Sequence, residues 1–237
     1  MTTEKISYQS YEEMAEFYFS KVDTKPYNAY YERPNTISLL PNVKGKKVLD
    51  AGCAAGWYTE WLIKQGAEVT AIDFSPRMIE MTKRRVGDQA KIIQADLNMP
   101  LDFIETHSLD LIISSLTLHY LKDWQPVFDE FNRILIKGGQ LVFSVHHPFM
   151  DFTLFNRENY FLTELLTDEW NVMGKKIEVQ FYRRPLNEII KQIIRSGFII
   201  EDLLEPLPTD KFKQVLPDDY QELTKRPHFL FIKLRKA

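Results

Sequence analysis

Short runs of apolar, often β-branched residues alternate with segments of helical periodicity from residue 46 onward. This alternation is typical of an α/β fold, a mostly parallel sheet with helices on both of its faces. Because the runs are almost continuously apolar, we expect strands that are buried on both faces. The expected strands cover residues 47–51, 68–73, 91–95, 109–114 and 140–145.

Two of the segments between these strands carry helix signals. Ser75 followed by Pro76 is typical of an N-cap and the first residue of a helix. A second helix is predicted by the apolar face of residues 127–135, and we expect it to stop at the glycine pair 138–139.

The last third of the chain has a different pattern. Residues 185–196 predict a helix that Gly197 closes, and residues 198–204 and 228–234 predict two further strands. The connection 205–227 is rich in proline, so we expect it to be irregular.

Two segments, residues 1–45 and 148–182, fall outside the alternation, and both are rich in tyrosine, phenylalanine and tryptophan. Neither has the composition of a disordered tail. We therefore expect both to pack as a lid over the ligand-binding edge of the sheet, within one domain that spans residues 1–237.

The composition of the chain limits which binding partners and which cellular compartment we expect. The formal net charge is −3, so no global basic field would attract nucleic acid, and no stretch reaches the roughly 18 apolar residues of a membrane helix. Cys53 is the one cysteine, which excludes an intrachain disulfide and fits a reducing compartment. We expect a cytoplasmic protein in which Cys53 is a packed loop residue; a nucleophilic thiol is the alternative.

The first expected strand runs into a turn of small residues, from Asp50 to Gly56, that leads to a helix. Small residues let a ligand approach the backbone closely, and the first amides of a helix can donate hydrogen bonds to it. A dinucleotide fingerprint counted from Gly52 would require glycine where this chain has Ala54 and Trp57. Asp50 would repel a pyrophosphate but suits a ligand that carries ammonium and sulfonium charges. The loop therefore favours a cationic ligand.

Two more acidic residues follow strands at the same edge. Asp73 ends the second strand, where a carboxylate can accept two ribose hydroxyls; a helix N-cap is its alternative role, although Ser75 fills that role better. Asp96 and Leu97 follow the third strand and could hold an adenine amino group and ring, or could simply form a turn.

Five stretches together resemble the class I S-adenosylmethionine-dependent methyltransferases of the UbiE-like small-molecule group. They are Val48-Leu49-Asp50-Ala51-Gly52-Cys53-Ala54-Ala55-Gly56, Ala71-Ile72-Asp73-Phe74-Ser75-Pro76-Arg77-Met78, Gln94-Ala95-Asp96-Leu97, and the segments 109–120 and 135–141. The similarity covers about residues 8–147 well and the C-terminal strands more loosely.

The resemblance implies a Rossmann-like seven-stranded sheet with an antiparallel last strand, and S-adenosylmethionine as the cofactor, with S-adenosylhomocysteine as product. It divides the chain into N-terminal lid helices (1–45), a donor-binding core (46–147), an inserted lid segment (148–182) and a C-terminal helix with strands (183–237). Ala54 departs from the usual glycine, which weakens binding only if this residue needs a positive φ.

The resemblance and the positions at strand ends together give the expected donor-binding residues. These are Tyr18, Asp50, Ala51, Gly52, Cys53, Ala54, Gly56, Asp73, Phe74, Met78, Asp96, Leu97, Ser114, Ser115 and Leu116.

Methyl transfer needs mainly orientation, which can contribute about 7 to 11 kcal/mol, so a dedicated catalytic residue is not required. If the acceptor must lose a proton, His119, His146 and His147 are candidate bases because they follow the fourth and fifth strands. A structural role is favoured for them over a base, and a metal site comes last. Arg183 and Arg184 are either contacts for an acidic substrate or two exposed charges.

The acceptor is expected to be a small molecule that receives the methyl group on oxygen, nitrogen or carbon. Its identity and the oligomeric state cannot be read from these residues. Two other classes remain open, a protein that binds the donor without turnover and an NAD-dependent oxidoreductase, which Trp57 disfavours.

Overall fold

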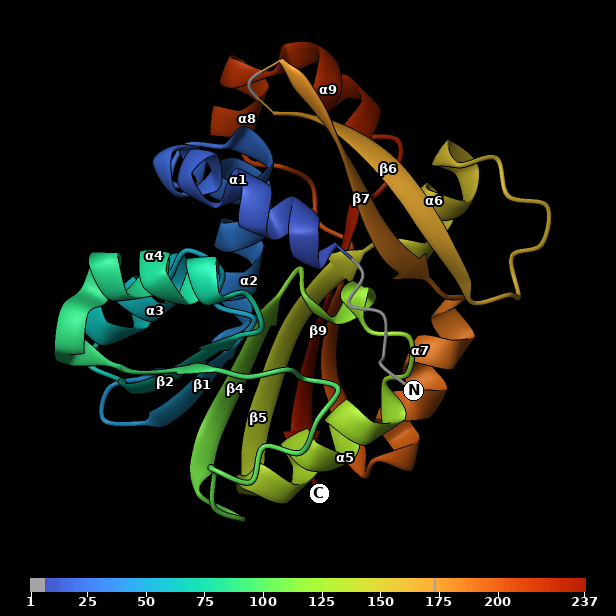
Figure 1. Ribbon diagram of the computed structural model, residues 1–237. Helices are drawn as coiled ribbons and strands as arrows, with labels where there is room; N and C mark the ends of the chain where they lie inside the picture. Colours follow the sequence, from blue (N-terminus) through green and yellow to red (C-terminus); the bar gives the residue numbers. More distant parts are fainter. Residues whose placement is uncertain (1–6, 173) are drawn as a thin grey trace.

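The computed structural model describes residues 7–172 and 174–237, and a seven-stranded sheet forms its centre (Figure 1). The strand order is β3-β2-β1-β4-β5-β9-β8, and β9 alone among these strands runs antiparallel to its two neighbours. This confirms the expected sheet and its antiparallel last strand. The strands are β1 (Lys47–Ala51), β2 (Glu68–Asp73), β3 (Lys91–Gln94), β4 (Leu109–Ser115), β5 (Leu135–His146), β8 (Phe198–Leu204) and β9 (Phe229–Lys236).

Helices cover both faces of the sheet (Figure 1). One face packs against α2 (Arg33–Leu39), α3 (Trp57–Lys64) and α4 (Pro76–Val86), and the other packs against α5 (Gln125–Ile134) and α7 (Leu186–Arg195). Side chains alternate between the two faces along each strand. Val48 therefore packs on the face that α3 covers, and Leu49 packs on the face that α5 covers.

Two expectations about the chain's connections were wrong. Helix α5 ends at Ile134 because Leu135 is already extended and pairs with β4, so Gly138 lies inside β5 rather than at a helix end. The proline-rich connection holds two helices, α8 (Asp210–Val215) and α9 (Pro217–Leu223). Proline suits the first turn of a helix, where its missing N–H has no partner in any case, and Pro217 begins α9.

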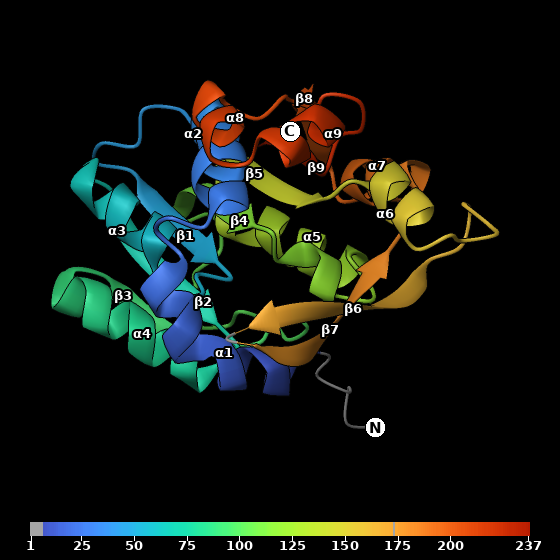
Figure 2. The same cartoon turned by 90° about the horizontal axis from the view of Figure 1, so that it is seen from above.

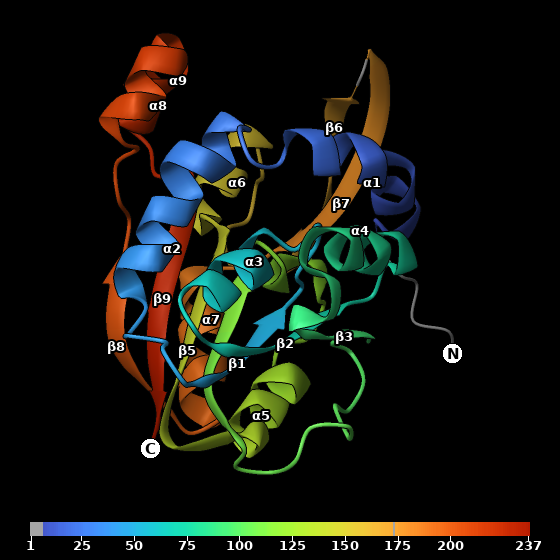
Figure 3. The same ribbon diagram turned by 90° about the vertical axis from the view of Figure 1, so that its left-hand side faces the viewer.

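The two aromatic segments lie together over the carboxyl ends of the strands (Figures 2 and 3). They contain α1 (Tyr8–Lys21), the turn η1 (Asn28–Glu32), α6 (Pro148–Leu154) and a hairpin of β6 (Glu164–Val172) and β7 (Lys175–Arg183). The Ser7 hydroxyl donates to the Gln180 carbonyl at 2.8 Å and accepts from the Gln180 amide at 2.7 Å. Within the described residues, no helix is long and apolar enough to cross a membrane.

A buried carboxylate ties the N-terminal segment to the sheet. Glu32 is fully buried, and its Oε1 accepts hydrogen bonds from Thr36 at 2.7 Å, Ser115 at 2.8 Å and Ser144 at 2.7 Å. Its Oε2 accepts from the Tyr58 hydroxyl at 2.8 Å. Four hydroxyl donors replace the water that a carboxylate loses on burial, and they come from α2, β4, β5 and α3.

Replacing Glu32 by alanine should therefore reduce the free energy of unfolding by on the order of 3 kcal/mol, because several buried hydroxyls lose their acceptor. Glu80→Ala is the matched control, since Glu80 is exposed on α4 and its loss should cost less than about 0.5 kcal/mol. Urea unfolding followed by circular dichroism measures both variants. Equal losses in the two would contradict the central role of Glu32.

Candidate functional site

A cavity of about 320 Å³ lies between the carboxyl ends of the parallel strands and the lid. Nine of the expected donor-binding residues line it. They are Tyr18, Gly52, Ala54, Asp73, Phe74, Asp96, Leu97, Ser115 and Leu116.

The turn after β1 reaches the cavity with a strained backbone. Gly52, Ala54 and Gly56 all have positive φ, at 86°, 47° and 76°. A Cβ at Gly52 would come within 2.2 Å of the Thr117 hydroxyl, so only glycine fits there. Ala54 does occupy the conformation that favours glycine, which costs roughly 1–2 kcal/mol. Ala54 therefore does have the positive φ at which alanine in place of glycine was expected to weaken binding.

Asp73 holds this turn in place from the end of β2. Its Oδ2 accepts from the Ala54 amide and its Oδ1 from the Ser75 amide, both at 2.9 Å. The N-cap of α4 is Ser75, whose hydroxyl accepts from the Met78 amide, so Asp73 is free of that role as expected. Burial raises the pKa of Asp73 to about 6, against the lowering effect of its two amide donors.

Asp96 and Leu97 line the cavity beside Asp73. The Asp96 carboxylate also accepts from the backbone and side-chain nitrogens of Asn98, both at 2.9 Å. Asp96 therefore forms a turn and lines the cavity at the same time, so its role in the turn does not exclude a contact with adenine.

Asp50 corrects one expectation. Its carboxylate lies behind the turn, only 1% exposed, and accepts from the Thr59 hydroxyl of α3 at 2.6 Å instead of lining the cavity. Alternation along β1 points Asp50 to the same face as Val48, which α3 covers. Burial raises the pKa of Asp50 to about 7.

Five other expected donor contacts also lie outside the cavity wall. They are Ala51, Cys53, Gly56, Met78 and Ser114. Ala51 is packed in the core, and its carbonyl accepts from the Ser114 hydroxyl at 2.9 Å. Met78 packs beneath α1, and Gly56 caps α3.

Cys53 is buried with its Sγ 3.6 Å from the Thr82 hydroxyl. Burial, together with the nearby carboxylates Asp73 and Asp50, raises its pKa well above the usual range. The thiol is therefore a packed loop residue and not an activated nucleophile.

The three candidate histidines separate into two groups. His119, in the short turn η3 (Leu118–Tyr120), and His146, at the end of β5, line the cavity. His147 does not line it, because its Nε2 lies 2.6 Å from Glu205 and its Nδ1 accepts from the Phe149 amide to cap α6. Among residues 7–172 and 174–237, no group of three potential ligands is arranged to hold a metal ion.

Arg183 and Arg184 are neither exposed nor part of the cavity wall, which corrects both expectations for them. Arg183 is paired with Glu164 at 3.0 Å. Arg184 stacks on Trp124 at 4.0 Å and donates to the Leu121 carbonyl. Arg184 therefore ties the end of the lid hairpin to the core, whereas Arg183 holds the lid segment together, because its partners all belong to that segment.

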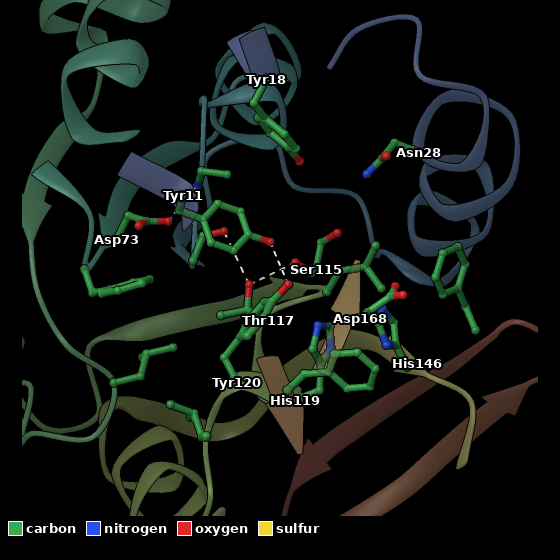
Figure 4. A pocket seen from close by; sticks show the side chains of 18 of the residues that line it. Tyr11, Tyr18, Asn28, Asp73, Ser115, Thr117, His119, Tyr120, His146 and Asp168 are labelled. Carbon is green, nitrogen blue, oxygen red and sulfur yellow. Dashed lines mark hydrogen bonds between the residues drawn. The ribbon is translucent and has the colours of Figure 1, made fainter. Parts of the chain in front are cut away.

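Most residues at the far end of the cavity are not among those expected from the sequence. These include Tyr11, Lys25, Tyr120, Asp168, Trp170, Phe181 and His228. The aromatic content of the two lid segments indicated a cover, but nothing in the pattern indicated which side chains face inward. In Figure 4, Tyr11 and Tyr120 lie between Asp73 on one side and His119, His146 and Asp168 on the other, with their hydroxyls 2.7 Å apart.

The raised pKa of Asp50 generates a prediction about stability. The folded-state value of about 7 exceeds the ordinary value of about 3.9, so the folded protein binds more protons between pH 4 and 7. The free energy of unfolding therefore falls as pH rises through this window, by at most about 1.4 kcal/mol per pH unit. Asp50→Asn keeps an acceptor for Thr59 and should make this fall shallower.

Urea unfolding at several pH values from 4.5 to 7.5 measures the effect. Asp73 titrates in the same direction up to about pH 6, so part of the fall remains in the variant. Identical slopes in the two proteins would contradict the prediction.

Comparison with known proteins agrees with this architecture. Residues 49–143 match the family described as a methyltransferase domain. A Haemophilus influenzae protein described only as uncharacterized is 28% identical, over 89% of each chain. Phosphoethanolamine N-methyltransferase from Triticum aestivum is 35% identical over 47% of this chain and 23% of the enzyme. Malonyl-[acyl-carrier protein] O-methyltransferase from Hamiltonella defensa is 28% identical over 46% of this chain. This chain matches 41% of that enzyme, so it spans less than half the length of either named enzyme.

Two solved structures share both sequence and fold with this chain. A protein from Listeria monocytogenes assigned as an S-adenosylmethionine-dependent methyltransferase is 28% identical with a TM-score of 0.76, over 87% of this chain and 96% of its own. An S-adenosylmethionine-dependent methyltransferase from Mesorhizobium loti is 26% identical with a TM-score of 0.72, over 91% of this chain and 100% of its own. Residues 49–143 therefore form a methyltransferase domain, and the strand order and these two relatives support a class I S-adenosylmethionine-dependent methyltransferase.

Proposed function

We propose that this protein transfers the methyl group of S-adenosylmethionine to an oxygen, nitrogen or carbon of a small molecule that is enclosed under the lid. The observation that supports this proposal most is a continuous cavity lined both by strand-end residues and by residues of the lid. Its volume of about 320 Å³ lies in the usual range for small-molecule sites. The named relatives differ in their methyl acceptors: one is a phosphoethanolamine N-methyltransferase and another is a malonyl-[acyl-carrier protein] O-methyltransferase.

The residues at the strand ends suit the donor. Asp73 accepts hydrogen bonds from two backbone amides, and its carboxylate keeps further lone pairs that ribose hydroxyls could use. Leu97 offers an apolar surface for the adenine ring, beside the carboxylate of Asp96. Gly52 and Ala54 bring the backbone close to the amino acid part of the ligand. When bound, S-adenosylmethionine supplies a methyl group on a positively charged sulfur.

The protein's contribution to the reaction is mainly orientation and exclusion of water. The lid covers the strand ends, and the hydroxyls of Tyr11 and Tyr120 meet where the two halves of the cavity join. Holding both reactants in one geometry can lower the barrier by about 7 to 11 kcal/mol. Methyl transfer therefore needs no metal and no covalent intermediate.

The two alternative functions make different predictions about binding. A dinucleotide enzyme needs glycine where Trp57 begins α3, and here the indole packs under the Arg33 guanidinium at 4.0 Å. A donor-binding protein without turnover would bind S-adenosylmethionine but would transfer nothing.

Isothermal titration with S-adenosylmethionine, S-adenosylhomocysteine and NAD should show binding of the first two and no measurable binding of NAD. Both sulfur compounds share the adenosyl and amino acid groups that the strand ends would hold. Binding of NAD without binding of S-adenosylmethionine would contradict the methyltransferase proposal.

The assignment of the ribose to Asp73 has its own test. Asp73→Ala should weaken S-adenosylhomocysteine binding about 100-fold, because two hydrogen bonds to a charged acceptor are lost at about 1.5 kcal/mol each. Ser75→Ala is the control, since it removes the N-cap of α4 but leaves the Asp73 carboxylate in place. An unchanged dissociation constant for Asp73→Ala would show that the ribose binds elsewhere.

A further inference from the structure

Seven buried side-chain nitrogen and oxygen atoms have no hydrogen-bond partner among the described residues, and all seven belong to residues around one small void. These residues are His119, His146, Asp151, Arg183 and Arg184. Buried polar atoms are nearly always paired, so their concentration at one place marks a polar pocket within the packed core. The void measures about 10 Å³, which is about the space for one water molecule.

His146 connects this void to the main cavity. Its Nδ1 is buried on the side of the void, 3.7 Å from Asp151 Oδ1, while the ring also lines the cavity and is 14% exposed. The edge that faces the cavity therefore carries Nε2. A distance of 3.7 Å is too long for a direct hydrogen bond, but one bridging water or a small closure on substrate binding would join the two residues.

The His146 ring has little freedom to turn. It stacks on the His119 ring with centroids 4.2 Å apart and planes 20° apart, and it meets the edge of Phe181 at 4.6 Å and 83°. Burial raises the pKa of Asp151 well above its ordinary value, so its ionised form is favoured only when a positive imidazole lies beside it. A bridging water or a closure that brings Asp151 Oδ1 within hydrogen-bond distance would hold the ring proton on Nδ1. The lone pair of Nε2 then points into the cavity.

Burial lowers the pKa of His146 well below its ordinary value, and His119, His228 and Lys25 act in the same direction. Burial likewise lowers the pKa of His119 to about 3 and that of His228 to about 4. The histidines of the cavity are therefore neutral at neutral pH. Burial disfavours the imidazolium that proton transfer would form, so His146 needs a negative partner at Nδ1, and Asp151 is the carboxyl group placed there. The charged or titratable groups around His146 are His119, His228, Lys25, Asp151, Asp168, Arg183 and Arg184.

The acceptor end of the cavity is mainly aromatic, and its described lining residues include a single basic side chain. Lys25 is the one lysine or arginine among its described lining residues, and its Nζ lies over the Trp170 ring at 4.8 Å. Asp168 accepts a hydrogen bond from the Trp170 indole at 2.8 Å. The Lys25 ammonium and the Asp168 carboxylate therefore both contact the Trp170 side chain. A flat neutral ring could pack against Phe155 and Phe181, whereas an anionic acceptor would have to draw the Lys25 ammonium away from the Trp170 ring.

We propose that His146 is the general base of the reaction, that Asp151 positions it, and that the acceptor is a neutral aromatic hydroxyl compound. This inference rests on the proposed methyltransferase function. As the hydroxyl oxygen forms its bond to the methyl carbon, the carbon–sulfur bond breaks and its electron pair stays on sulfur. The hydroxyl proton passes to His146 Nε2, and the imidazolium that results keeps its Nδ1 proton directed at Asp151.

The first test reads the His146 ring without any turnover. Nitrogen NMR on the histidine-labelled full chain, with the His146 signals assigned by their loss in His146→Asn, should show a neutral ring at pH 7 with the proton on Nδ1. Asp151→Ala should shift these signals toward a mixture of tautomers, and His107→Asn, in an exposed loop, should leave them unchanged. A ring that is charged at pH 7, or protonated on Nε2, would overturn the proposal.

The second test compares three probes of one shape, para-cresol, para-toluidine and para-toluate, as acceptors of labelled methyl groups. We expect transfer to the cresol and none to the toluate. His146→Asn should slow transfer to the cresol by about 10²–10⁴-fold. Transfer to the toluidine should change less than tenfold, because an amine attacks with its lone pair before it loses a proton.

Raising the pH separates a base from a structural role. The rate of His146→Asn with the cresol should rise about tenfold per pH unit toward the phenol pKa of about 10, since the ionised acceptor needs no base. Asp151→Ala should show a smaller loss of kcat with little change in KM.

S-adenosylhomocysteine binding by each variant shows that the fold and the donor site are intact. Equal losses with cresol and toluidine, preference for the toluate, or no transfer to any probe by protein that binds the donor would overturn the inference. Loss of donor binding in the unmodified protein would instead overturn the proposed function.

Discussion

The buried carboxylate of Glu32 is the interaction on which the site depends most. It accepts from hydroxyls on α2, α3, β4 and β5, so it fixes the N-terminal segment against two neighbouring strand ends. Ser144, one of its donors, also accepts from the Leu116 amide at 3.1 Å, and Leu116 lines the cavity. A charge that is buried without water must keep all its donors, which makes this part of the molecule rigid.

Rigidity of this kind allows strain at the cavity. Ala54 and Leu116 both have a positive φ of 47°, and they follow the neighbouring strands β1 and β4. Each is held by a hydrogen bond through its amide, to Asp73 and to Ser144. Strained backbone that persists at a binding site is maintained by the surrounding structure. Here it directs backbone and side chains toward the place that the donor would occupy.

The two halves of the cavity are constructed differently. The donor half uses the ends of consecutive parallel strands, so its polar groups are short side chains on a rigid frame. The other half combines side chains of the lid with His119 of η3 and His146 of β5, and burial lowers the pKa of both histidines. Tyr11 and Tyr120 meet at the boundary. The same donor geometry can therefore be combined with different acceptors when only the lid residues change.

The amino-acid sequence by itself determined the strands of the sheet, most of the helices between them and the set of residues that meet at the strand ends. Parallel strands place their carboxyl ends at one edge, so residues such as Asp73, Asp96 and Ser115 meet there whatever the connections between them. Only the tertiary structure decided that Asp50 faces α3, because its orientation depends on which face of β1 a helix covers. The acceptor half was equally hidden, since packing between remote segments, and no local periodicity, selects the side chains that face inward.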